Sequence, residues 1–61
     1  MYSVIYGVDR TGFVSIDEAR SFLFDKAMSG NFTVITLIED TGIGDIKIIM
    51  EWHNNQGYMF Y

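Results

Sequence analysis

The sequence contains neither cysteine nor proline among its 61 residues. The absence of cysteine excludes a disulfide framework and thiolate chemistry, and it fits a reducing compartment. No apolar run reaches the length of about 18 residues that a membrane-spanning helix needs. The first residues also lack the basic segment of a signal peptide. We therefore expect a single domain over residues 1–61, located in the cytoplasm or, for a viral protein, in the host cytoplasm.

Positive charge is scarce. Four lysine and arginine residues face eight aspartate and glutamate residues, which gives a formal net charge of −4. Binding to nucleic acid or to an anionic membrane depends on neutralising phosphates, so neither partner is expected. A protein partner with a basic surface is the natural electrostatic match.

Apolar residues, in contrast, are abundant for so short a chain. They make up 49% of the sequence and include ten aromatic residues. A domain of about 60 residues buries only about 60% of the surface of its unfolded chain. The excess therefore predicts contact with another protein surface, either a second copy of the chain in a homodimer or a different partner.

The first half of the chain predicts a strand and a helix. Residues 2–8 alternate, which indicates a strand with one apolar face. Tyr2, Val4, Tyr6 and Val8 are predicted on that face, and Ser3, Ile5 and Gly7 on the other. Asp9–Gly12 has the composition of a turn, and Phe13-Val14 is either a short returning strand or extended chain.

The helix carries the clearest local signals in the sequence. Ser15 followed by Glu18 three residues later forms a capping-box pattern, and it predicts a helix from about Ile16 to Ser29. Gly30 is the expected stop. Phe24 and Met28 lie on one flank of this helix, and they are either part of a wide core face or contacts for a partner.

Residues 32–38 and 46–52 alternate with many β-branched positions and predict a hairpin around a glycine-rich loop at 40–45. The even-numbered side chains are predicted to share the face under the helix, with paired residue numbers that sum to either 84 or 86. Ile35, Leu37 and Ile49 would then lie together on the outer face. Such an aliphatic patch within a polar rim is typical of an interface, although scattered apolar residues are also common on surfaces.

A turn at residues 53–57 predicts a last strand at Tyr58–Tyr61. The length of that turn does not decide which of its side chains face the core. Tyr58, Phe60 and Tyr61 are candidate interface residues because this strand would be an exposed sheet edge. The predicted fold is α+β, in the order β-α-β-β(-β), with one helix on one face of an antiparallel sheet.

No pattern predicts catalysis, a cofactor or a metal site, so we expect a protein that is not an enzyme. Asp40-Thr41-Gly42 resembles the triplet of aspartic proteases, but it falls in an apparent hairpin loop of a chain too short for flaps and a cleft. Glu39, Asp40 and Asp45 form an acidic tip without calcium-loop spacing, and they are candidate electrostatic contacts for a basic partner. His53 has no second histidine or cysteine with which to bind a metal.

These features favour a small acidic protein-binding module, acting as a homo-oligomer, that inhibits or modulates another protein. A compact, acidic, cysteine-free domain of this size suits the small inhibitors that bacteriophages use against host enzymes or defence systems, so a phage-encoded inhibitor is one expectation from size and class. Two alternatives remain open. One is a small-ligand-binding or sequestering oligomer, with a pocket at the dimer seam lined by tyrosines and Trp52. The other is a structural subunit of a larger complex.

Overall fold

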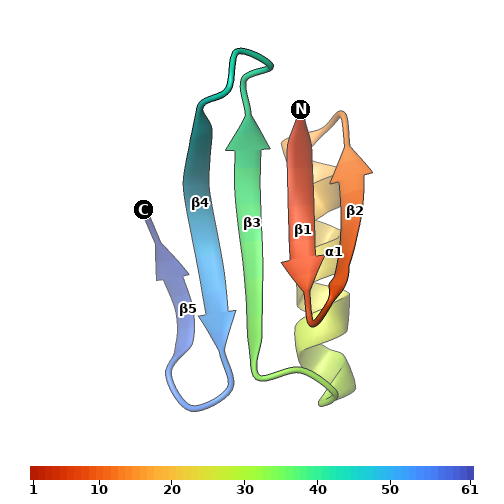
Figure 1. Ribbon diagram of the computed structural model, residues 1–61. Coiled ribbons are helices and arrows are strands. Elements are labelled where there is room, and N and C mark those ends of the chain that lie inside the picture. Colours follow the sequence, from red (N-terminus) through yellow and green to blue (C-terminus); the bar gives the residue numbers. More distant parts are fainter.

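The computed structural model describes residues 1–61 as five antiparallel strands and one helix, an α+β fold (Figure 1). The strand order across the sheet is β2-β1-β3-β4-β5. The elements are β1 (Tyr2–Tyr6), β2 (Asp9–Phe13), α1 (Ile16–Ser29), β3 (Val34–Asp40), β4 (Ile46–His53) and β5 (Gly57–Phe60). The predicted helix-on-sheet class is confirmed, and β2 joins the sheet as an edge strand.

The turn of the first hairpin lies earlier than the sequence suggests. β1 and β2 are joined by Gly7 and Val8 alone, and Tyr6 pairs with Asp9. Gly7 has a φ of 61°, and glycine is favoured as the first central residue of a two-residue hairpin turn with positive φ there. The predicted turn at Asp9–Gly12 is therefore wrong, because a tight turn at Gly7 leaves these residues free to pair with β1.

The helix begins and ends where the sequence predicts. The Ser15 hydroxyl accepts a hydrogen bond of 3.2 Å from the backbone N–H of Asp17, one residue earlier than in a standard capping box. Gly30 ends the helix in the left-handed conformation with a φ of 77°. This helix is too short and too polar to cross a membrane.

The core lies between α1 and the sheet. The helix buries a narrow stripe made of Ala19, Leu23 and Ala27. The strands contribute four side chains with no exposed surface: Val4, Ile35, Leu37 and Met50. Because α1 packs against β1, β2 and β3, strands β4 and β5 extend past it on one side (Figure 1).

The register between β3 and β4 changes along the hairpin. Near the loop, Ile38 pairs with Ile48, which matches one of the two predicted sums. The register is irregular between Ile38 and Leu37, and Leu37 pairs with Met50. Ile49 is therefore an extra residue on β4, without a partner on β3. A β-bulge of this kind changes which side chains share a face.

The bulge overturns the predicted face of β3. Leu37 and Ile35 pair with Val4 and Tyr6 of β1, and they lie in the core with them. The odd-numbered side chains of β3 therefore face the helix, and the even-numbered ones face away from it. Met50 is on the helix side, as predicted. After the bulge, even-numbered residues of β4 pair with odd-numbered residues of β3, so Met50 lies beside Leu37 in the core.

Candidate functional site

One complete face of the sheet has no helix over it (Figure 1). We call this side the open face, and we define it by five side chains: Ile5, Ile38, Ile46, Ile48 and Met59. The cross-strand pairs place them there. Ile46 is 61% exposed and Ile48 is 42% exposed, whereas neighbouring side chains cover Ile38. Polar residues such as Ser3, Thr36 and Glu51 share this face, as is usual where an antiparallel sheet faces water, so the aliphatic side chains form a patch with polar neighbours.

Glu51 also lies on the open face, between Thr36 of β3 and Met59 of β5, and two further side chains hold it in place. The Tyr61 hydroxyl donates a hydrogen bond of 2.6 Å to Glu51 Oε1, and His53 Nε2 lies 3.3 Å from the same oxygen. Both hydrogen bonds lower the pKa of Glu51 below its ordinary value of 4.5, and the one from Tyr61 has the larger effect. The bond to Glu51 raises the pKa of Tyr61. Glu51 is thus a negative charge held at a fixed position on the open face.

A second apolar surface lies on the helix side, where β5 extends past α1. We call it the aromatic flank and define it as Phe24, Met28, Tyr58 and Phe60. The rings of Phe24 and Tyr58 meet edge to face, with their centroids 5.2 Å apart. Met28 is 84% exposed and Phe60 is 69% exposed. Helix and last strand therefore combine their aromatic residues into one patch.

The structure separates the residues predicted to form an interface. Ile35 and Leu37 were expected on the outer face, and that placement is wrong because both are fully buried under α1. Ile49 is partly buried and packs against the same core at the bulge. Phe24, Met28, Tyr58 and Phe60 lie together on the aromatic flank, while Tyr61 lies beside Glu51 on the open face.

Sequence reasoning missed the residues of the open face, although it expected an apolar outer face. Ile38, Ile46 and Ile48 were assigned to the core because they share the parity of Met50. Their true position depends on the bulge at Ile49. Ile5 was placed opposite Tyr2, Val4 and Tyr6 by the alternation of β1, and this alternation is confirmed.

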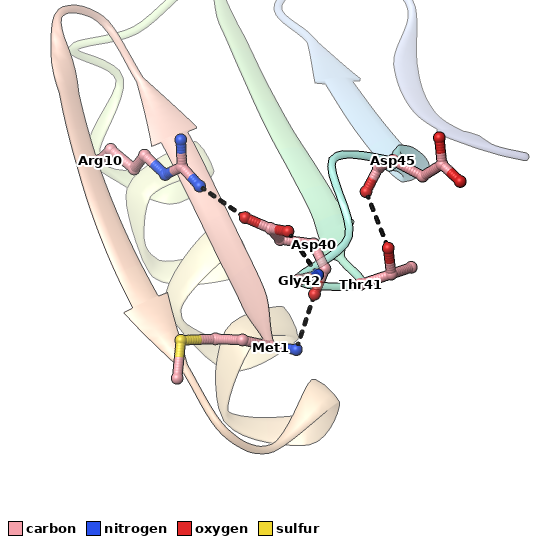
Figure 2. Close-up of polar contacts among 6 residues, drawn as sticks. All are labelled: Met1, Arg10, Asp40, Thr41, Gly42 and Asp45. Carbon is pink, nitrogen blue, oxygen red and sulfur yellow. Dashed lines mark hydrogen bonds and ion pairs between the residues drawn. The ribbon is translucent and has the colours of Figure 1, made fainter.

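The carboxylates predicted at the loop tip do not form one cluster (Figure 2). Asp40 lies 3.9 Å from Arg10, and its Oδ1 accepts a hydrogen bond of 2.9 Å from the Gly42 N–H. The side chain of Asp45 points away from Asp40, and its backbone carbonyl accepts a bond of 3.3 Å from the Thr41 hydroxyl. Glu39 pairs across the strands with Lys47.

These contacts give the Asp40-Thr41-Gly42 triplet the geometry of a turn, in which the aspartate side chain binds the backbone two residues later. No group of three acidic or histidine side chains is arranged to hold a metal ion. The loop tip is therefore an exposed acidic turn.

The largest hollow on the surface lies elsewhere, with a volume of about 400 Å³. It is formed by one side of α1, from Asp17 to Asp25, and by the end of β2, and it is widely open to solvent. Its lining residues are Phe13, Asp17, Glu18, Ser21, Phe22 and Asp25. The tyrosines and Trp52 that the ligand-binding alternative requires do not line it.

Comparison of the chain with protein-family models, with curated proteins and with solved structures finds no match.

Proposed function

We propose that this protein is a non-enzymatic protein-binding module that inhibits or modulates another protein by covering part of that protein's surface. The observation that carries the proposal is the open face. Five aliphatic or methionine side chains lie on the face of the sheet that α1 leaves uncovered, and two of them, Ile46 and Ile48, are exposed there. Apolar patches of this kind within a polar rim are characteristic of protein-binding sites.

The negative charge of the chain indicates which kind of partner surface would fit the open face. The chain has a net charge of −4, and the open face itself carries Glu51 with a lowered pKa. The complementary surface is therefore apolar at its centre with basic residues around it. In this proposal Ile46 and Ile48 are the anchors, because they are the most exposed aliphatic side chains of the face. The cytoplasm is the proposed compartment for this encounter.

A pair of lysine substitutions tests the proposal. Ile48→Lys places a positive charge on the open face, where it loses an apolar contact and repels the basic residues of the partner. Val8→Lys makes the same change in charge at a turn residue that is fully exposed and remote from that face. The tagged wild-type chain and both variants are used to capture proteins from a lysate of the host cell. The partner is then purified for direct binding measurements.

We expect the wild-type chain and Val8→Lys to bind the partner equally, and Ile48→Lys to bind at least about tenfold more weakly. Circular dichroism must show that both variants keep the fold. A partner that binds Ile48→Lys as tightly as the wild type would show that the open face is not the binding surface. Absence of any captured protein would remove the proposal altogether.

A further inference from the structure

Strand β5 is an edge of the sheet, and its backbone bonding shows which groups are free. The Tyr61 N–H donates to the Ile49 carbonyl at 3.0 Å, and Met59 pairs with Glu51. Antiparallel neighbours exchange hydrogen bonds at every second residue. Met59 and Tyr61 therefore direct their backbone groups toward β4, whereas Tyr58 and Phe60 direct theirs outward.

The same two residues carry the exposed side chains of the aromatic flank. Tyr58 is 40% exposed and Phe60 is 69% exposed, and Phe24 supports the Tyr58 ring from the helix. Unpaired N–H and carbonyl groups and aromatic anchors thus occur at the same positions on one strand. This combination is the one that strand addition uses, since the backbone supplies hydrogen bonds and alternate side chains supply packing.

The two edge strands of the sheet, β2 and β5, differ in how well they are protected against pairing with a strand of another molecule. Natural edge strands avoid unwanted pairing by means of charges, proline or bulges. The β2 edge carries Asp9 and Arg10. The β5 edge has the sequence Gly-Tyr-Met-Phe, with no charge, no proline and a regular pairing with β4. Only the β5 edge is therefore open to another strand.

We propose that β5 pairs with β5 of a second copy, antiparallel about a two-fold axis that passes beside Met59. Tyr58 then lies directly opposite Phe60 of the second copy, and the reverse pair forms on the other side of the axis. The outward groups of these residues make four hydrogen bonds across the seam. The two sheets join into one, with the aromatic flanks of both copies side by side.

This register is self-complementary, as a two-fold interface requires. Tyr58 and Phe60 are a hydrogen-bonded pair across the seam, and their side chains meet on the helix side as a cross-strand aromatic pair. Met59 faces its own counterpart on the open face. Tyr61 falls opposite Gly57 of the second copy, where the missing side chain leaves room for the ring.

The area sets the strength of the dimer. The exposed parts of Tyr58, Phe60 and Tyr61 amount to about 350 Å² per copy, at roughly 200 Å² for a whole aromatic side chain. Two copies then bury about 700 Å² of side-chain surface, below the range of about 1,200–2,000 Å² for stable complexes. The dimer is therefore weak, and it forms only at high protein concentration. Because each copy has a net charge of −4 and β5 carries no charged side chain, added salt weakens the repulsion between the copies and strengthens the dimer.

Self-association through β5 stands independently of the proposed partner. It uses the edge and the aromatic flank, and it leaves Ile46 and Ile48 free. Because Met59 belongs to the open face, pairing at β5 makes the two open faces continuous. A dimer therefore presents a partner with twice the apolar surface of one copy.

A cysteine introduced at the axis tests the register. In a pair that is not hydrogen-bonded, the two Cα atoms lie about 4.5 Å apart, within the disulfide range of about 4.4–6.8 Å. Because the chain has no cysteine of its own, Met59→Cys forms one disulfide-linked species under mild oxidation. Val8→Cys is the control, since Val8 is fully exposed in the turn between β1 and β2 and far from the seam.

We expect Met59→Cys to form a covalent dimer at least about tenfold faster than Val8→Cys at equal micromolar concentration. Equal oxidation rates for the two variants would overturn the register. A wild-type chain that sediments as a monomer from micromolar to millimolar concentration would overturn the dimer itself.

A proline at Phe60 tests the backbone contribution. Its missing N–H removes two of the four seam hydrogen bonds but none of the bonds to β4, whereas Phe60→Leu keeps the N–H and an apolar side chain. We expect Phe60→Pro to weaken dimerisation about tenfold or more relative to Phe60→Leu, with the helix signal unchanged in circular dichroism. Equal dimerisation of both variants would contradict strand pairing. Loss of partner binding in Ile48→Lys with an intact dimer would separate the two surfaces.

Discussion

Replacing Leu37 by alanine is the most direct test of the strand register in this fold. Leu37 is fully buried beneath α1 and lies in the same core cluster as Leu23 and Met50. The register predicted from sequence parity would instead leave its side chain on the outer face. The two arrangements therefore predict different losses in the free energy of unfolding for the same substitution: a large loss for a buried Leu37 and a small one for an exposed Leu37.

The structure sets the expected magnitude. Truncating a fully buried leucine to alanine costs about 2–5 kcal/mol, from the lost transfer of apolar surface and the cavity left behind. A domain of this length has a free energy of unfolding of about 3–9 kcal/mol, at roughly 0.05–0.15 kcal/mol per residue. Leu37→Ala should therefore remove a large share of the free energy of unfolding and move the midpoint of urea unfolding to a clearly lower concentration.

Ile48→Ala is the matched control, because Ile48 is an aliphatic residue of the same hairpin that is 42% exposed on the open face. It should cost about 1 kcal/mol, since much of its side chain is already in water. Urea unfolding followed by circular dichroism measures both values, at a concentration low enough for the chain to be monomeric. If Leu37→Ala costs less than Ile48→Ala, the register and the assignment of the open face are both wrong.

Two further predictions concern the helix cap and the carboxylate of the open face. Ser15→Ala removes the hydrogen bond to the Asp17 N–H and should lower the free energy of unfolding by about 1 kcal/mol, whereas Ser21→Ala on the exposed side of the helix should be neutral or stabilising in the same urea assay. Tyr61→Phe removes the hydrogen bond that most lowers the pKa of Glu51, so the Glu51 pKa should rise toward 4.5 in an NMR titration of its carboxyl carbon. Because the folded pKa is the lower one, this stabilisation is present above pH 4.5 and is lost as the pH falls through the folded pKa; an unchanged Glu51 titration in Tyr61→Phe would refute the contact.

Local signals in the sequence were enough to define the helix. Ser15 and Gly30 mark its ends because capping depends on residues within one turn of each end. The hairpin loop at 40–45 and the last turn were also predicted, since glycine and asparagine act through their own backbone preferences. The alternation in β1 correctly separated Val4 from Ile5, because a single regular strand obeys a period of two.

The first turn shows where local signals are ambiguous. Asp9–Gly12 has the composition of a turn, whereas Gly7-Val8 offers only its glycine, and the choice between them depends on how many residues pair with β1. Pairing β2 along its whole length with β1 favours the tighter turn. That gain arises between strands and is not visible in either segment alone.

The candidate surfaces divide in the same way. The sequence by itself determined that the chain has more apolar surface than it can bury, because this conclusion depends only on composition and length. It left Phe24 and Met28 as either core or partner contacts, and the structure shows that both are exposed. Tertiary structure decided which face of β3 is buried. The bulge at Ile49 shifts the β3–β4 register by one residue, and β1 holds Ile35 and Leu37 in the core. Because one residue of shift moves a whole strand's side chains to the other face, only the assembled sheet places Ile38, Ile46 and Ile48 on its open side.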